Sequence, residues 1–527
     1  MQKTSVNVAV LYAGLIMTCL LVPRPATAQL TPQQAAGRQI YTEGTSPSQS
    51  PMEAILGDGS TRVPARLMPC SSCHGSDGKG RPEGGVVPSD VTWDALSRPL
   101  WSDNALERRR PAYDDKSLRR SITDGLDSAG TELGITMPRF SMTVTDLDSL
   151  VEYLKLLGRQ PAPGVTADSI LISTIVPGSG PLAAVGRSHV ELLRAWFAEL
   201  NDQGGIYGRK LELQAVQATG TPDEAVSRVE QALKEHPVFA VIGILAPGAE
   251  KKLGELLEQD GVPVVGTVAA VAAHEPQSSK TFYVLSGLTQ QACALVKFAH
   301  SRSEGPDRTM AVVFPESQRE LADSVVEEWR QRDITAVERV EYSKFDAAGT
   351  AALLARSHEQ GVFFLGSGRE LQEMLQAAEK LQWLPMVFQP GPLTDPGVFG
   401  ISSAFSERVF FSLPTLPSDV VPAAVHEYEA LVSNHAVSSP QPALSLVVLA
   451  SAKVLTEGLR QSGRQLSREK FVQSLSALID FQTGLTPVLN FSPTRRIGAL
   501  GAYVVKLDLK NRTFTPVDSW ITIAPMP

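Results

Sequence analysis

The chain has 527 residues, of which 43% are hydrophobic and 20% are charged, and its formal net charge is −8. This composition is ordinary for a globular protein, and the length predicts several domains. The acidic balance and the lack of a basic run give no reason to expect nucleic-acid binding.

The first 28 residues have the features of a secretory signal peptide. Lys3 precedes an apolar run of 15 residues from Val8 to Val22, and Ala26-Thr27-Ala28 matches the A-x-A cleavage pattern. The run is short for a membrane span, which needs about 20 residues. We therefore expect export to the periplasm with cleavage before Gln29. An uncleaved anchor is the alternative, and a lipoprotein site at Cys19 fits its neighbours poorly.

The exported part contains Cys70-Ser71-Ser72-Cys73-His74, which is the C-x-x-C-H pattern of covalent c-type haem attachment. In such a site the two thiols bond to the haem vinyl groups and the histidine ligates the iron. A zinc site would need two more Cys or His ligands, and none lies between Gln29 and His189 outside the motif. We predict one covalent haem c, held by Cys70, Cys73 and His74.

An electron-transfer haem needs a second axial ligand on the iron. The haem motif holds the only histidine between Gln29 and His189, so a methionine is the candidate. Met68 is too close to Cys70 to reach the opposite face of the haem. Met137-Pro138-Arg139-Phe140 precedes a predicted helix, and we predict Met137 as the ligand. The other methionines of the segment are Met52 and Met142, of which Met142 is the alternative ligand.

Residues 31–158 resemble a class I cytochrome c domain, which implies an all-α fold and the transfer of single electrons. In that family a proline carbonyl accepts the ring N–H of the haem-ligating histidine, and Pro88 is the matching residue, with Pro82 as the alternative. Residues 45–65 depart from the family pattern, and we expect them to form a surface loop near the haem edge. The resemblance rests on Gly37, Tyr41, Cys70–His74 and Met137–Phe140.

The remainder of the chain alternates between apolar strands and amphipathic helices, a pattern typical of doubly wound α/β structure. We predict a signal peptide at 1–28, a cytochrome c domain at 29–158, a proline-containing linker at 159–168 and an α/β domain at 169–527. The expected strands are 170–176, 210–218, 238–243, 263–267, 310–315, 337–342 and 362–366.

The α/β domain resembles the type I periplasmic binding proteins of the branched-chain amino-acid class. The resemblance implies two α/β lobes, joined by hinge strands, that close over a ligand. We place the crossings near Ser286, Ser412 and Ala499, with lobe 1 at 169–286 and 412–498 and lobe 2 at 287–411 and 499–527. The matching stretches are Gly178–Ala184, Asn201–Arg209, Val241–Gly243 and Val262–Val265.

Ligands of open α/β sheets bind beyond the carboxyl ends of the strands. The candidate cleft residues are therefore Ser179, Ala246, Gly248 and Thr267. The amino-acid-binding pattern is broken at three places. The turn 245–248 lacks the hydroxyls that capture a carboxylate, Ala270 replaces a threonine, and Gln389–Pro392 replaces an acidic residue. We therefore favour a less polar organic ligand or a docking role.

Three functions fit these features. The first is a periplasmic electron carrier for a quinoprotein dehydrogenase, because binding-protein-like chains accompany quinoprotein alcohol oxidation systems. In that case the α/β domain recognises a small organic ligand or docks the redox partner. The second is the substrate-binding component of an ABC importer, with a permease as partner. The third is a sensor in which cleft closure moves the haem domain. Since no nucleophile–base set is evident, we do not expect an enzyme.

Overall fold

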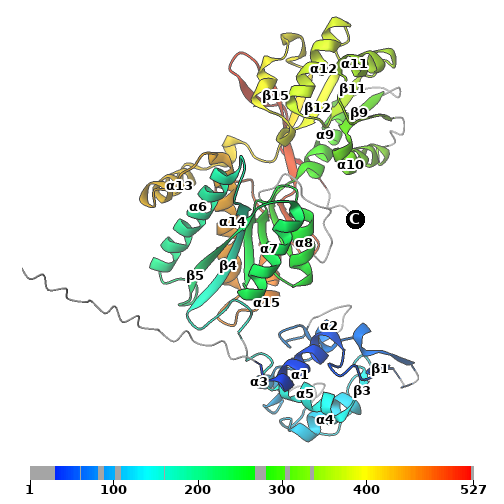
Figure 1. The fold of residues 1–527 in the computed structure, drawn as a ribbon, viewed down its shortest axis with the longest axis vertical. Coiled ribbons are helices and arrows are strands. Elements are labelled where there is room, and N and C mark those ends of the chain that lie inside the picture. Colours follow the sequence, from blue (N-terminus) through cyan, green and yellow to red (C-terminus); the bar gives the residue numbers. More distant parts are fainter. Residues whose placement is uncertain are drawn as a thin grey trace, which may run out of the picture. The chain divides into compact units, whose positions relative to one another are not determined.

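The computed structural model describes residues 30–523, apart from residues 58, 60, 81–87, 101–108, 160, 268–279, 303–308 and 333–336. The predicted signal peptide, Pro82 and Ala270 lie outside the described residues. The chain divides into two compact units, of which the first ends at Gln160 and the second begins at Pro161 (Figure 1).

The front unit is built on the crossing of helices α1 (Pro32–Glu43) and α5 (Val144–Leu154). A Cβ on Gly37 would lie only 1.9 Å from the Ser149 carbonyl oxygen, so a glycine is needed where the helices cross. Thr31 begins α1 with a capping box, as the sequence predicts. The shorter helices of this unit are α2 (Cys70–His74), α3 (Trp93–Leu96) and α4 (Asp115–Thr123).

The front unit is not all-α, so that prediction is wrong. It contains a three-stranded antiparallel sheet in the order β2-β1-β3, formed by β1 (Glu53–Leu56), β2 (Thr61–Pro64) and β3 (Arg139–Ser141). The insertion at 45–65 thus forms a hairpin instead of a loop. Its inward-facing residues explain this, because Ala54 is buried and pairs with Phe140 of β3 within the core.

Lobe 1 of the second unit has a six-stranded parallel sheet in the order β14-β8-β7-β6-β4-β5. The strands are β4 (Ser169–Pro177), β5 (Lys210–Ala218), β6 (Ala240–Ile244), β7 (Val264–Thr267), β8 (Thr281–Leu285) and β14 (Ile497–Ala499). One face is covered by α7 (Pro222–Glu235) and α8 (Glu250–Gln259), and the other by α6 (Ala183–Asp202), α13 (Pro422–Asn434), α14 (Pro442–Gln461) and α15 (Arg468–Ser476).

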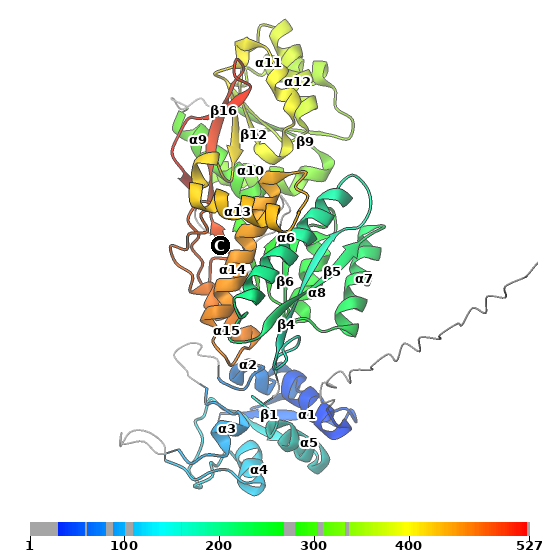
Figure 2. The ribbon, with the colours of Figure 1, turned by 90° about the vertical axis from the view of Figure 1, so that its left-hand side faces the viewer.

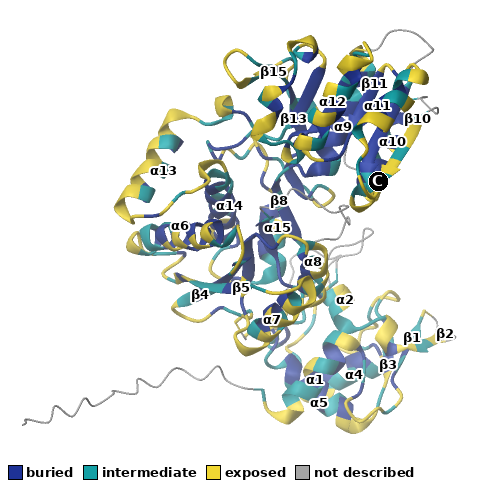
Figure 3. Ribbon diagram, turned by 45° about the horizontal axis from the view of Figure 1, so that its top comes forward, coloured by how far each residue is buried: buried dark blue, intermediate teal, exposed yellow. Residues whose placement is uncertain are grey.

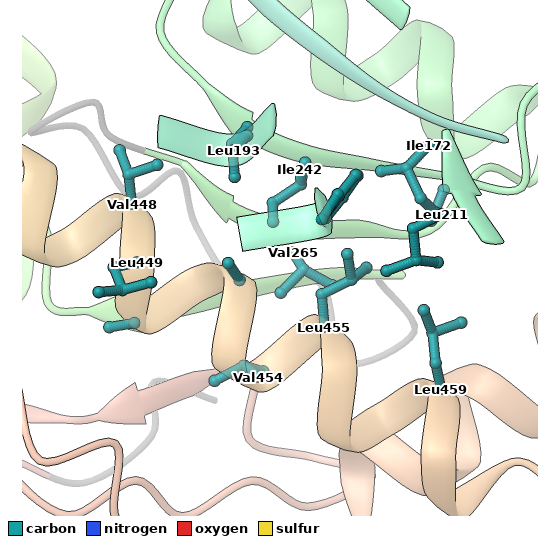
Figure 4. Close-up of a cluster of buried hydrophobic side chains, with 14 of the residues drawn as sticks. Ile172, Leu193, Leu211, Ile242, Val265, Val448, Leu449, Val454, Leu455 and Leu459 are labelled. Atoms are coloured by element: carbon teal, nitrogen blue, oxygen red, sulfur yellow. The ribbon is translucent and has the colours of Figure 1, made fainter. Parts of the chain in front are cut away.

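Helix α14 is the central element of the lobe 1 core. It lies beside α6 (Figure 2), and its Val448, Leu455 and Leu459 face strand residues such as Ile242 (Figure 4). Among the described helices, α14 alone is long and apolar enough to cross a membrane. Because 61% of its apolar window is buried inside the protein, its composition is that of a core helix.

Lobe 2 has an eight-stranded sheet that is parallel from β10 through β9, β11 and β12 to β13, and antiparallel beyond β13. Helices α9 and α10 cover one face and α11 and α12 cover the other. The strands β9, β11 and β12 between them are buried, whereas the edge strand β10 is largely exposed (Figure 3). The elements are α9 (Leu288–Arg302), β9 (Met310–Pro315), α10 (Arg319–Arg330), β10 (Val337–Tyr342), α11 (Ala347–Arg356), β11 (Gly361–Phe364), α12 (Gly368–Lys380), β12 (Met386–Pro390), β13 (Val409–Leu413), β15 (Gly501–Asp508), β16 (Thr513–Pro516) and β17 (Ile521–Thr522).

The chain passes between the lobes three times, close to the predicted positions. The first crossing follows β8 at Ser286, and the third follows β14 at Leu500. The second lies later than predicted, because Ser412 still pairs within the lobe 2 sheet and β13 continues to Leu413. Lobe 2 therefore includes residues 412 and 413, and lobe 1 includes Ala499.

The predicted linker is shorter than expected. Val165 is 6% exposed and belongs to the lobe 1 core, and the Leu171 N–H donates to the Gly164 carbonyl at 2.7 Å. Residues 161–168 are thus part of the second unit, because Val165 gains burial there. The expected strands 210–218, 310–315 and 337–342 are confirmed residue for residue, whereas the strand expected at 238–243 spans 240–244.

Candidate functional site

The first candidate site is the haem motif, which forms the single helical turn α2. Residues three and four apart lie on one face of a helix, so Cys70, Cys73 and His74 are presented together. Both cysteines are free thiols, Cys73 is exposed, and burial raises the pKa of Cys70 to about 12. Within the described residues no three His, Cys, Asp or Glu side chains converge on a metal-sized site.

The His74 ring is held by the backbone, but not by the predicted residue. Its Nδ1 lies 2.9 Å from the Ser89 carbonyl oxygen. The prediction of Pro88 is wrong by one residue, because the Pro88 carbonyl faces Gly80, where a Cβ would lie 2.1 Å away from it. Burial lowers the pKa of His74, so the ring is neutral at pH 7. With Nδ1 donating to Ser89, the Nε2 lone pair is available to a metal.

The four methionines that lie within the described part of the front unit differ in their surroundings. Met52 is buried in the core, and Met68 and Met142 pack against it. Met137 is partly exposed and lies outside that core cluster, on the loop that precedes β3. Of the four thioethers, that of Met137 is therefore the one not engaged in core packing.

The residues present fit a covalent haem. Two free thiols, a neutral imidazole and a thioether are the donor set of a His/Met haem c. Large apolar side chains close in sequence to Cys70 and to Met137 are exposed: Leu67 is 65% exposed and Ile135 is 68% exposed. A porphyrin would cover apolar surface of this kind. When bound, such a group supplies reversible one-electron transfer, and the chain would supply its two axial ligands.

The second candidate site lies at the carboxyl edge of the lobe 1 sheet. Ser179 follows β4 and is exposed, and Gly248 follows the neighbouring strand β6. Thr267 ends β7, and its buried Oγ1 has no hydrogen-bond partner among the described residues. Ala246 was a wrong choice as a cleft side chain, because it is 3% exposed and its methyl group packs into the core beneath α8.

Glu250 is a residue of this edge that the sequence reasoning missed. The Gly248 N–H donates to Glu250 Oε2 at 2.7 Å. This amide, just before the start of α8, is therefore already bonded to a carboxylate of the chain itself. Burial raises the pKa of Glu250, and the Gly248 N–H opposes that shift. The only available signal was an acidic residue at the first position of a helix that follows a buried strand.

At the matching edge of lobe 2 the position expected to hold an acid is a buried amide. Gln389 is fully buried, its Nε2 donates to the Gly366 carbonyl at 2.9 Å, and its Oε1 has no partner among the described residues. An acidic residue, Glu370, lies at a different position of the same edge. Its carboxylate accepts hydrogen bonds from Tyr342 Oη at 3.1 Å and from the Ser367 N–H at 2.8 Å. Its carboxylate is therefore already engaged.

The hinge between these two edges contains a buried serine. Ser286 Oγ donates to the Ala499 carbonyl at 2.8 Å and accepts the Gly501 N–H at 2.9 Å. One hydroxyl thus links the first and third crossings. At the second crossing, Tyr503 Oη donates to Asp419 Oδ1 at 2.6 Å.

Two α/β lobes, each with a mainly parallel sheet, joined by three crossings define a type I periplasmic-binding-protein fold. A family profile described as "Periplasmic binding protein" matches residues 169–512. The chain belongs to this family.

Curated relatives agree with this assignment. The Leucine-, isoleucine-, valine-, threonine-, and alanine-binding protein of Pseudomonas aeruginosa is 22% identical over 361 residues, which are 67% of this chain and 90% of that protein. The Leu/Ile/Val-binding protein of Escherichia coli is 21% identical over 59% of this chain and 84% of its own length. The match to the Leu/Ile/Val-binding protein BraC3 of Rhizobium johnstonii is 32% identical but spans only 29% of that protein. All three are named as binding proteins.

Solved structures show the same fold. A fatty acid ABC transporter substrate-binding protein from Thermomonospora curvata has a TM-score of 0.53 and 15% identity, over 68% of this chain and 94% of its own. A leucine-binding protein from Thermotoga maritima has a TM-score of 0.51 and 18% identity, over 67% of this chain and 99% of its own. At these identities the likeness concerns the fold alone.

Proposed function

We propose that this chain is a periplasmic solute-binding protein, in which the two lobes of the second unit close over a small organic ligand. The observation that carries the proposal is the pair of strand edges, joined by three crossings, with buried polar atoms at both edges. The substrate-binding component of an ABC importer is the function that the relatives' names favour, and a permease is then the partner.

The ligand class follows from the charges at these edges. Glu250 places a carboxylate where the start of a helix would otherwise attract an anion. Gln389 Oε1 and Thr267 Oγ1 are buried oxygen atoms without partners among the described residues. Such groups cost free energy unless a ligand or a water pairs with them. We infer a ligand that donates hydrogen bonds and carries no carboxylate, such as an alcohol or an amine.

A ligand screen tests this proposal. Differential scanning fluorimetry of the full chain would compare L-leucine, L-leucinol and 3-methylbutan-1-ol, which share a side chain but differ in the carboxylate. We expect the alcohols to raise the melting temperature and L-leucine to leave it unchanged. A shift with L-leucine alone would contradict the ligand class, and the lack of a shift with a wide range of solutes would contradict solute binding.

A second function is favoured by a separate observation. We infer that the front unit is a class I cytochrome c domain with one covalent haem, because α2 presents two free thiols and a neutral imidazole whose Nδ1 is engaged by Ser89. Electron transfer to a periplasmic redox partner, such as a quinoprotein dehydrogenase, would be its role. Met137, whose side chain lies outside the core cluster, would be the second ligand.

Absorption spectroscopy of the chain produced with a haem-attachment system tests this inference. We expect a c-type spectrum with a thioether-ligation band that is lost in Met137→Ala and kept in Met142→Leu. Loss in Met142→Leu alone would transfer the ligand role to Met142. A chain that carries no covalent haem would refute the cytochrome assignment and leave solute binding untouched.

A further inference from the structure

The loop that carries Met137 is held by the side chain of Arg139. Arg139 Nη1 donates to the Met137 carbonyl at 2.5 Å, and Nη2 donates to the Leu133 carbonyl at 3.1 Å. A guanidinium group offers two parallel donors in a rigid plane. Arg139 therefore joins both ends of the loop 133–137 through a single planar group.

The surroundings of Arg139 are shaped to accept this arrangement. A Cβ on Gly125 would lie 1.5 Å from Arg139 Nε, and Gly125 has a positive φ of 70°, a backbone conformation that favours glycine. Any larger residue at that position would displace the guanidinium. The Gly125 carbonyl also accepts the Leu133 N–H at 2.7 Å, so the same glycine ties down the start of the loop.

The backbone on the other side of Arg139 is equally constrained. Arg139 begins β3 and pairs with Ile55 of β1, so the hairpin formed by the insertion fixes its main chain. Within the loop, the Met137 N–H donates to the Gly134 carbonyl at 3.0 Å. Met137 is thus anchored through both its N–H and its carbonyl, while its side chain remains outside the core cluster.

We propose that Arg139 is a positioning residue for the sixth haem ligand, acting through its bridge between the Met137 and Leu133 carbonyls. The proposal rests on the inferred cytochrome function of the front unit. Without the bridge the loop loses its closure, and the Met137 thioether spends less time in one position. The guanidinium of Arg139 also places a positive charge two residues along the chain from Met137, which favours the ferrous over the ferric state.

The test uses the full chain with its haem attached, in the variants Arg139→Gln and Arg139→Lys. Arg110 provides a matched control, because its guanidinium also donates to carbonyl oxygens, those of Arg98, Pro111 and Ala95, at 3.1–3.2 Å. The readouts are the affinity of the ferric haem for added imidazole, which competes with the thioether, and the reduction potential. Thermal unfolding of each variant checks that the fold is kept.

We expect Arg139→Gln to bind imidazole at least about tenfold more tightly than the wild type and to have a lower potential, since the loss of bonds from a charged donor weakens methionine ligation. Arg139→Lys should lie between the two, and Arg110→Gln should match the wild type. Wild-type affinity and potential in Arg139→Gln, or an equal change in Arg110→Gln, would overturn the proposal. Failure of the cytochrome assignment would instead be visible in the wild type, as the lack of haem or of a thioether band.

Discussion

The hinge hydroxyl of Ser286 gives the sharpest test of the second unit. Ser286→Ala removes one oxygen atom that donates to the Ala499 carbonyl and accepts the Gly501 N–H. The side chain is 4% exposed, so water does not readily replace the lost bonds. A buried polar group left without a partner costs about 1–3 kcal/mol, and two such groups remain here. We expect the free energy of unfolding of the second unit to fall by about 2–6 kcal/mol.

Urea unfolding followed by circular dichroism measures this loss, and hydrogen exchange of peptides that include Gly501 localises it. Ser462→Ala is a suitable control, because Ser462 is also a buried serine. Its Oγ donates to the Gly458 carbonyl of the adjoining helix at 2.6 Å, with a longer contact of 3.3 Å to Ser474 Oγ, and it accepts no backbone N–H among the described residues. Its loss should cost no more than about 1 kcal/mol. Exchange at Gly501 should speed up in Ser286→Ala only.

A loss below about 0.5 kcal/mol in Ser286→Ala, or unchanged exchange at Gly501, would refute the reasoning, since it would mean that the two groups find other partners. An equal loss in Ser462→Ala would show that the cost belongs to any buried serine. Either result would remove Ser286 as a link between the crossings.

Two further predictions concern lobe 1. Glu250→Gln removes the negative charge at the start of α8, so calorimetry should show that this variant binds L-leucine at least about tenfold more tightly than the wild type does. The control Glu224→Gln, at the capping box of α7, should leave the leucine affinity unchanged. Equal leucine affinities of Glu250→Gln and the wild type would contradict the role given to Glu250. Burial lowers the pKa of His189 from 6.5 to about 4. Between pH 6.5 and pH 4, His189 therefore binds a proton in the unfolded chain but not in the native chain. The free energy of unfolding should therefore fall by about 3 kcal/mol as the pH drops from 6.5 to 4, and the same fall in His189→Leu would exclude His189 as its source.

Local sequence patterns predicted most of the second unit. β9 is a short apolar run that is buried on both faces, whereas β5 and β10 lie at the edges of their sheets and alternate apolar with polar residues. Both patterns are typical of strands, which is why all three match their predicted residues. The same reasoning failed for β1 and β2, since hydrophobic alternation in a Ser-, Pro- and Gly-rich insertion is weak. Pairing with β3, far away in the sequence, is what orders that hairpin.

The candidate sites divide in the same way. The C-x-x-C-H spacing identifies Cys70, Cys73 and His74 directly, because three groups on one helical turn need no tertiary contact to come together. The partner of His74 was misplaced by one residue, since the direction of a carbonyl depends on backbone angles that residue identity does not specify. Ala246 was misjudged for a related reason: the loop turns its methyl group into the core.

The sequence by itself determined the order of the domains, the fold of the larger one and the chemistry that a haem motif can offer, because these depend on periodicity and on spacing within a few residues. Only the tertiary structure decided which groups are already engaged. The Glu250 carboxylate accepts the Gly248 N–H, and the Arg139 guanidinium donates to the Met137 carbonyl. The Ser286 hydroxyl bonds to residues that lie 213 and 215 positions further along the chain. The Ser286 contacts arise from packing between distant segments, which no local pattern encodes. The Glu250 and Arg139 contacts join residues only two apart, but they depend on loop and side-chain conformations that residue identity does not specify.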